Sequence, residues 1–424
     1  MYAGAELKAY IAFGTLPSSG GCSFDRMLRI VRRGSPRRWL DPGRGRSLIL
    51  VELVLEESSA EVVLKPAVDA VFALFDGQPV LFSATGQKIY QLDQVGGFIW
   101  CRLAQGASLA AVYHEMGKLD IVEPVARQFV RQAISSWIDR GLLDVDRRMS
   151  TNCAFSTVLG RHRISVRAEN RDLLQRLVSL FCASDNVDGQ ADIAVEAMML
   201  EDQVLFGGID AGLHRCGAEA LAPTIKARLT DRLIRSDRWV FALHAASLAK
   251  NGAGLLLCGE AGAGKSTLAL QLVGAGFQYS GDDVALIESD GTACGIPFAL
   301  TLKEGSWEWS SVSHSNWDGV THRRADGAQV RYLPVSNAHN GSLPVGWIIF
   351  LNRVASGSPE LTALDQLDSM RRLIEGAFAA DGRLSTTGFF ALKEIVSGAR
   401  SFLLTYCEAA EARELLVDLC NGKA

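Results

Sequence analysis

The sequence lacks long hydrophobic runs, paired-cysteine spacings and any excess of positive charge. Its longest apolar runs, such as SLILVELVL and WIIFL, are far too short to span a bilayer, and no secretion signal opens the chain. The nine cysteines show no Cys-x-x-Cys spacing, and several lie inside apolar runs, as Cys258 does in GLLLCG. This pattern is typical of reduced thiols rather than of disulfides or a zinc site. The net charge of −4 argues against a surface built for nucleic acid. We therefore expect a cytoplasmic protein with neither a nucleic-acid nor a membrane partner.

The composition is that of an ordinary globular protein. Of its 424 residues, 48% are hydrophobic and 21% are charged, enough for two or three domains. Residues 1–58 are different, because eight arginines lie between Arg26 and Arg46 among Gly, Pro and Ser. We interpret this segment as a poorly ordered tail or as an over-long start, with Met27 as an alternative first residue. A basic patch for an acidic partner is the other interpretation. We assign the segment no function.

Residues 60–146 are predicted to form a small α+β domain of winged-helix type. AVFALFDGQPVLFSATGQKIYQLD alternates apolar and polar residues around two turns, which predicts three short strands. Three helices follow, the first stopped by Gly106, the second capped by Ser108, and the third running from Glu123 to Arg140. Seven Lys and Arg against ten Asp and Glu give this stretch a charge of −3, which disfavours DNA.

The same stretch resembles the PqqD family, the peptide-recognition domain found in the biosynthesis of modified ribosomal peptides. The resemblance lies in LKPAV, GQKIYQLDQVGGFIWCRLAQGASLAAV and VARQFVRQAISSWIDRGLLDV. It implies that the leader segment of a precursor peptide adds as an extra strand along Gln87 to Leu92, against the helix face from Val125 to Ile138. Self-association through this domain is the alternative, and a homo-oligomer is left open.

Residues 151–424 alternate apolar strands such as YSGDDVALI with helices such as NRDLLQRLVSLFCAS (Asn170 to Ser184), which predicts an α/β domain with a central sheet. Within it, GEAGAGKS fits G-x-x-x-x-G-K-[ST], between the apolar GLLLC and a helix-forming run. Such glycines let backbone N–H groups surround a phosphate at the N-terminus of the next helix. We expect Lys265 to reach the β- and γ-phosphates of ATP and Ser266 to hold Mg²⁺. The predicted nucleotide-binding residues are Gly259, Glu260, Ala261, Gly262, Ala263, Gly264, Lys265, Ser266 and Thr267.

Two adjacent aspartates, Asp282 and Asp283, follow Lys265 by 17 and 18 positions, after one helix and a turn. Two carboxylates at a strand end beside a phosphate loop can divide the work, one accepting a proton from a hydroxyl and the other supporting the metal. A turn with two solvated acids is the alternative. His244 lies 15 residues before Gly259, where an isolated histidine is usually a core or turn residue.

LHAASLAKNGAGLLLCGEAGAGKSTLALQLVGAGFQYSGDDVAL, with its histidine, loop and aspartate pair, resembles HPr kinase/phosphorylase and its relatives. The resemblance implies an ATP- and Mg²⁺-dependent kinase that phosphorylates a serine hydroxyl. It implies Asp282 as the preferred general base, although either aspartate remains open, with Asp283 assisting Mg²⁺. His244 would orient the base or contact phosphate.

The chain departs from HPr kinases after the aspartate strand, where their Glu- and Arg-rich stretch is missing. GIPFALTLKEGSWEW stands there instead and resembles the related subgroup that includes lasso-peptide kinases. Lys303 would then meet phosphate charge and Glu304 would lie near the metal, with a surface position as the alternative for each. Arg331 is a further candidate cation, for which a structural role is the stronger interpretation.

The residues and the two resemblances together predict a serine kinase that acts on a ribosomally made precursor peptide. Tethering by the peptide-recognition domain would raise the local concentration of a weakly recognised serine. Three alternatives stay open: an HPr-type regulatory kinase of a carrier protein, a nucleotide-gated peptide-binding scaffold with little turnover, and a small-molecule kinase.

Overall fold

The structure, a computed structural model, describes most of the chain, from residue 63 to residue 422. The described ranges are 63–119, 121–146, 153–182, 189–210, 212–235, 239–307, 319–379 and 382–422. All of them belong to one compact unit, Ser58–Ala424. The arginine-rich segment 1–58 lies outside the described residues, so the interpretations of it stay predictions. None of the described helices combines the length and the apolar character that a membrane span needs.

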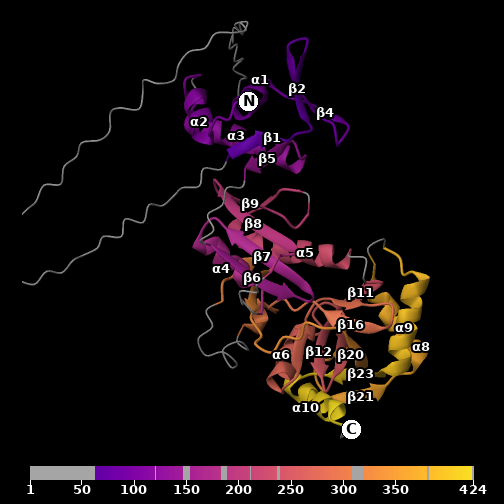
Figure 1. Cartoon of the computed structure of the whole chain (residues 1–424). Coiled ribbons are helices and arrows are strands. Elements are labelled where there is room, and N and C mark those ends of the chain that lie inside the picture. Colours follow the sequence, from indigo (N-terminus) through magenta and orange to yellow (C-terminus); the bar gives the residue numbers. More distant parts are fainter. Residues whose placement is uncertain are drawn as a thin grey trace, which may run out of the picture. The chain divides into compact units, whose positions relative to one another are not determined.

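The first described part, residues 63–146, contains three strands that form one small sheet and three helices (Figure 1). The sheet has the order β2-β3-β4, built from Ala70–Phe75, Gln78–Ser83 and Lys88–Gln91. The helices are α1 (Gln94–Ala104), α2 (Leu109–Gly117) and α3 (Glu123–Asp139), and β1 (Val63–Pro66) pairs with β5 (Leu143–Asp146).

Local sequence signals explain where these helices begin and end. Asp93 caps α1 by accepting the Gly96 N–H, and Ser108 caps α2 by accepting the Ala111 N–H. Gly106 and Gly141 adopt positive φ angles just beyond α1 and α3, as helix-ending glycines do. The core of this part centres on Trp100 and Trp137, whose rings meet edge to face at 5.2 Å. Such a pair contributes about 1 kcal/mol beyond its buried area.

A second sheet follows, with five strands in the order β10-β9-β8-β7-β6. Its strands are β6 (Ala154–Leu159), β7 (His162–Ala168), β8 (Ile193–Leu200), β9 (Gln203–Gly207) and β10 (His214–Cys216). Helices α4 (Arg171–Val178) and α5 (Leu221–Ile234), the latter preceded by the 3-10 turn η1 (Ala218–Ala220), bury their apolar residues against it. Met198 and Leu205, on β8 and β9, also pack against the core of residues 63–146.

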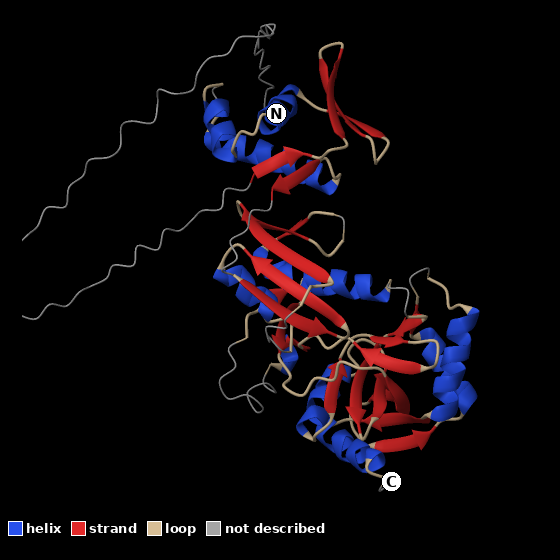
Figure 2. Cartoon of the chain, viewed as in Figure 1, coloured by secondary structure: helices blue, strands red, loops and turns tan. Residues whose placement is uncertain are grey.

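The largest sheet has ten strands and carries helices on both faces (Figure 2). Helices α6 (Lys265–Gly274) and α10 (Ala409–Cys420) share one apolar core with it. Helices α8 (Gln366–Glu375) and α9 (Thr386–Gly398) share a second apolar core with the same sheet. Its main path is β14-β12-β13-β20-β16-β15-β11-β22, with β23 pairing with β20 and β21.

The strands of this sheet are β11 (Phe241–Leu243), β12 (Ala245–Lys250), β13 (Ala253–Cys258), β14 (Gln278–Gly281), β15 (Ala285–Ile287), β16 (Thr292–Gly295), β20 (Leu343–Arg353), β21 (Glu360–Ala363), β22 (Ala377–Phe378) and β23 (Arg400–Tyr406). A separate three-stranded sheet has the order β17-β19-β18, from Leu300–Lys303, Gln329–Leu333 and His322–Arg323. The short turn η2 (Glu304–Ser306) follows β17.

The described residues therefore have the mixed α/β architecture that the sequence predicts, with two local differences. The predicted helix from Asn170 to Ser184 ends at Val178, because Leu180 and Phe181 leave it to pair with residues 298–299. The predicted single strand YSGDDVALI is two strands, β14 and β15, which lie apart in the sheet order. The predicted domain boundaries at 58–60 and 146–151 stay predictions.

Candidate functional site

The phosphate loop connects β13 to α6 at the edge of the buried core. The six residues of β13 are almost entirely apolar, and the loop leaves the strand at Gly259. Gly262 and Gly264 adopt left-handed backbone conformations, with φ angles of 91° and 94°. A Cβ at Gly264 would overlap the hydroxyl of Tyr406, which donates a 2.6 Å hydrogen bond to Ala263 O. The sequence motif thus produces a tight loop that ends at a helix N-terminus, the arrangement that binds phosphate.

Lys265 begins α6 and folds over the loop. Its Nζ donates to the carbonyl oxygens of Gly259 at 2.6 Å and Glu260 at 3.1 Å, and the residue is 7% exposed. Burial lowers the pKa of Lys265, an effect partly offset by the negative charge of Asp283. Ser266 and Thr267 follow, partly exposed, in the first turn of the helix. The loop, the ammonium group and the Ser266 hydroxyl together fit a nucleotide phosphate with its Mg²⁺.

The two aspartates lie between β14 and β15, where the chain passes from one position in the large sheet to another. Asp282 is 2% exposed, and both of its oxygens are engaged. Oδ1 accepts the Tyr279 hydroxyl at 3.1 Å and Oδ2 accepts the Thr301 N–H at 2.9 Å. Burial, followed by the charge of Asp283, raises the pKa of Asp282. This carboxyl is therefore an internal anchor in the geometry described.

Asp283 has the opposite environment. Its side chain is 47% exposed, and Oδ2 lies 2.6 Å from Nζ of Lys226. The positive charge of Lys226 lowers the pKa of Asp283, so this aspartate is a carboxylate at neutral pH. Of the two carboxylates, the one of Asp283 is open to solvent, whereas that of Asp282 is buried. The preference for Asp282 as the general base thus has a steric obstacle, and the division of roles stays a prediction.

Lys226 is not among the residues predicted from the sequence. It lies on α5, 56 positions before Asp282, and its ammonium group also lies 3.6 Å from Asp282 Oδ1 and 2.6 Å from Thr301 Oγ1. One signal was available, because Lys226 falls on the helix face of the buried residues Ala222, Ile225, Leu229 and Leu233. A lysine on a buried helix face needs a carboxylate partner.

His244 lies between β11 and β12, beside the aspartates. Its backbone N–H donates to Gly376 O at 3.1 Å, and Nδ1 lies 3.0 Å from the backbone carbonyl of Asp283. A carbonyl only accepts hydrogen bonds, so Nδ1 must carry the proton. The positive form of His244 also helps to lower the pKa of Asp283, after Lys226. The structure thus places His244 against the backbone of Asp283, and its predicted role remains a prediction.

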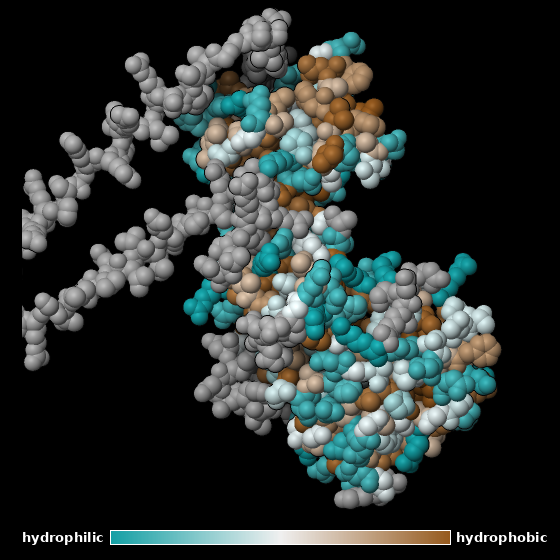
Figure 3. Space-filling view, in the orientation of Figure 1, coloured by the Kyte–Doolittle hydropathy of each residue, from teal (hydrophilic) through white to brown (hydrophobic). Residues whose placement is uncertain are grey.

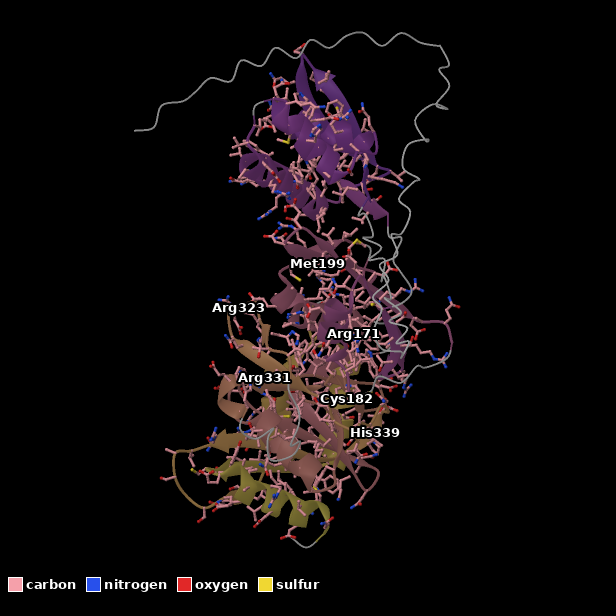
Figure 4. The ribbon with its side chains drawn as sticks, turned by 90° about the vertical axis from the view of Figure 1, so that its left-hand side faces the viewer. Arg171, Cys182, Met199, Arg323, Arg331 and His339 are labelled. Atoms are coloured by element: carbon pink, nitrogen blue, oxygen red, sulfur yellow. The ribbon has the colours of Figure 1, made fainter. Side chains whose placement is uncertain are left out.

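The three additional candidates occupy different positions. Lys303 ends β17 on the same strand face as Thr301, because side chains alternate along a strand, and its charge helps to lower the pKa of Lys265. Glu304 is exposed in η2. The Arg331 guanidinium lies 4.2 Å from the centre of the Trp307 ring and donates to Thr321 Oγ1, so it is engaged away from the aspartates. Figure 4 labels Arg331 on β19 and Arg323 on the neighbouring β18.

Several of the motif residues lie close enough for their charges to interact. The charges of Asp283, Lys303 and Asp282 all act on the ammonium group of Lys265. Among the described residues, no group of three or more His, Cys, Asp or Glu side chains could hold a metal ion by itself. Any Mg²⁺ here would share its ligands with nucleotide phosphate, and Ser266 and Asp283 are the predicted protein contributors.

Comparisons with known proteins add little to these observations. No protein-family model matches the chain, and no curated protein matches it. The Hpr(Ser) kinase/phosphatase from Coxiella burnetii is a similar solved structure, at 16% identity over 43% of this chain and 88% of that chain, with a TM-score of 0.22. A likeness of this size carries no argument about activity, substrate or partner. What the structure supports is a mixed α/β chain with a phosphate-binding loop beside two carboxylates.

Proposed function

We propose that this protein is an ATP-dependent kinase that phosphorylates a serine hydroxyl on a peptide held by residues 60–146. One observation supports the phosphoryl-transfer part: the half-exposed Asp283 lies close enough to the phosphate loop for its charge to act on the ammonium group of Lys265. A protein that only binds nucleotide needs no general base. A kinase needs one to orient the acceptor hydroxyl.

In this proposal the phosphate loop and Lys265 bind the phosphates of ATP, and Ser266 completes the site for Mg²⁺. Bound Mg²⁺ would neutralise charge on the β- and γ-phosphates. The serine oxygen forms a bond to the γ-phosphorus while the bond from that phosphorus to the oxygen of ADP breaks. The serine proton passes to Asp283. A carboxylate kept ionised by Lys226 is a weak base, but the loose transition state of phosphoryl transfer needs position more than basicity.

The peptide-holding part of the proposal is supported by exposed apolar side chains on residues 63–146. Brown residues gather over β2–β4 in Figure 3, and Val71, Leu74, Phe75 and Ile89 are exposed there. Val125 and Phe129, about 40% exposed, lie on α3, and the Arg140 guanidinium beyond its end lies 4.7 Å from the Tyr90 ring on β4. Among the described residues, β4 pairs only with β3, so one edge is free for an added strand.

The central experiment mixes the purified full chain with ATP, Mg²⁺ and short serine-containing peptides, including those encoded beside its gene. Mass spectrometry then locates phosphate on the peptide. We expect phosphoserine with the intact protein and a loss of roughly 100-fold or more in Lys265→Met and Asp283→Asn. Lys250→Met is the matched control, because Lys250 donates to Gly276 O and its ammonium group lies over the Phe277 ring. The absence of transfer to every such peptide would refute the kinase assignment.

Peptide capture is tested separately by fluorescence anisotropy. The labelled probe is the unphosphorylated form of a peptide that the kinase assay identifies as a substrate. Ile89→Asp or Phe129→Asp should weaken binding by roughly tenfold or more, since each removes an apolar contact. Phe390→Asp changes an exposed phenylalanine on α9, outside residues 60–146, and should leave the affinity unchanged. Equal effects of all three substitutions would contradict the proposed capture surface.

A further inference from the structure

Lys226 is an unusual residue for its place in the fold. It lies on the buried side of α5, its side chain is 11% exposed, and it reaches the site from the layer of the five-stranded sheet. Lys265, His244 and the two aspartates come instead from the large sheet or its connections, and Thr301 comes from β17. A buried ammonium group costs several kcal/mol unless it is paired and hydrogen-bonded. The two neighbouring carboxylates can supply that pairing, so the role of Lys226 is expected there.

The surroundings of Lys226 fix its ammonium group in one place. Thr301 Oγ1 lies 2.6 Å from Nζ, and the centres of the Phe298 and Tyr332 rings each lie 5.7 Å from it. Two aromatic rings and a hydroxyl leave a long, flexible side chain few alternative rotamers. The cation is thus a fixed point, and the carboxylates are arranged around it.

Distances show that the cation favours one of the two carboxylates. Nζ lies 2.6 Å from Asp283 Oδ2 but 3.6 Å from Asp282 Oδ1. Asp282 has two other donors, Tyr279 and the Thr301 backbone, whereas the side chain of Asp283 has Lys226 as its strong, charge-assisted partner. Without Lys226, the half-exposed Asp283 side chain would be free to rotate, and it would lie next to a like charge on Asp282.

We propose that Lys226 is a positioning residue for phosphoryl transfer: its fixed ammonium group holds the Asp283 carboxylate toward the phosphate loop and keeps it beside Asp282. This inference rests on the proposed kinase function. Lys226 acts through Asp283 and does not itself contact the nucleotide. Its loss should therefore affect the rate of transfer more than the binding of either substrate.

The kinetic test compares Lys226→Met, Lys226→Arg and the control Lys250→Met at one fixed pH. We expect Lys226→Met to lower kcat by roughly 100-fold with the KM for ATP within about twofold, as for a displaced catalytic group. Lys226→Arg keeps a cation at this position and should restore at least a tenth of the wild-type kcat. A fall in kcat that Lys250→Met shares, or a rise in KM alone, would overturn the inference.

A stability cycle tests the same contact without any kinase assay. Lys226→Met leaves the buried Asp282 carboxyl and its half-exposed neighbour Asp283 without this cation, and should lower Tm by roughly 5 to 10 °C. Lys226→Met combined with Asp283→Asn removes both charges and should be more stable than the sum of the single losses predicts. Additive losses would overturn the inference. Strong coupling in a protein that transfers no phosphate would instead refute the proposed function and leave the Lys226–Asp283 contact standing.

Discussion

Gly264 offers a direct measurement of how tightly the phosphate loop is built. Gly262 and Gly264 have nearly the same left-handed φ, 91° and 94°, but different surroundings. A Cβ at Gly262 meets nothing within 4 Å, whereas a Cβ at Gly264 overlaps the Tyr406 hydroxyl. Alanine at either position therefore suffers the same backbone strain, and only Gly264→Ala adds a steric clash. Comparing Gly262→Ala with Gly264→Ala therefore separates the cost of backbone strain from the cost of the steric clash.

The expected magnitudes follow from these two terms. A left-handed conformation costs a residue with a Cβ about 1 to 2 kcal/mol, so Gly262→Ala should lose about that much free energy of unfolding. Overpacking in a close-fitting site adds about 1 to 3 kcal/mol, which brings Gly264→Ala to about 2 to 5 kcal/mol. Tyr406→Phe alone should cost about 1 kcal/mol, because it removes the hydrogen bond to Ala263 O.

The double variant Gly264→Ala with Tyr406→Phe is the decisive comparison. Phenylalanine lacks the hydroxyl that the new Cβ would meet, and the next atom of that ring lies at 3.5 Å, an ordinary contact. The double variant should therefore lose less than the sum of its single losses, by about 1 to 3 kcal/mol. Urea unfolding without nucleotide measures each midpoint at constant m-value. Equal losses for Gly262→Ala and Gly264→Ala, or strict additivity with Tyr406→Phe, would refute this account of the loop.

Three further predictions concern stability away from the loop. Burial, helped by the charge of Arg176, lowers the pKa of His322 from 6.5 to about 4. As the pH drops from 6.5 to 4, the unfolded state therefore binds the histidine proton before the folded state does. The free energy of unfolding should fall by up to roughly 3 kcal/mol over this range. His322→Gln should flatten that dependence in urea melts at pH 7, 5.5 and 4, and an unchanged slope would contradict it. Trp137→Ala should cost about 3 to 5 kcal/mol, because the ring is 2% exposed against Trp100, yet leave the affinity for a fluorescent ATP analogue unchanged. Asn251 has a φ of 52° in the Asn251–Gly252 turn, so Asn251→Gly should be nearly neutral and Asn251→Val should lower Tm by several degrees.

The local parts of the fold follow from the sequence with little loss. Caps such as Asp93 and Ser108, stop glycines and alternating strands depend on neighbouring residues, so short windows contain the needed information. The same holds for the phosphate loop between β13 and α6. The shortened α4 shows the limit, because its last predicted residues pair instead with residues 298–299, more than a hundred positions away. Propensity cannot anticipate such tertiary competition.

The candidate site divides in the same way. Lys265, Ser266 and the aspartate pair are close in sequence and joined by one helix, so their convergence is predictable. Lys226 and Thr301 come from other layers, and their contacts with the aspartates depend on how those layers pack. The buried face of α5 indicates that Lys226 needs a partner, but nothing in the sequence identifies which carboxylate it meets.

Asp282 and Asp283 are adjacent in the sequence but lie in different environments. Both carboxylates lie near the Lys226 ammonium group, but Asp282 is 2% exposed and the Asp283 side chain is 47% exposed. The chain just before the aspartates packs closely on the backbone of Ile296. Only glycine fits at position 281, because a Cβ there would lie within 3 Å of that backbone. The close approach brings the chain against the strand region that supplies Thr301 and its N–H to Asp282. One carboxyl then anchors the chain in the core, and the anchored chain presents the second, held by Lys226, at the surface. In the proposed mechanism Asp282 supports the chain and Asp283 is the reacting group, so Asp282→Asn and Asp283→Asn should not reduce the activity equally.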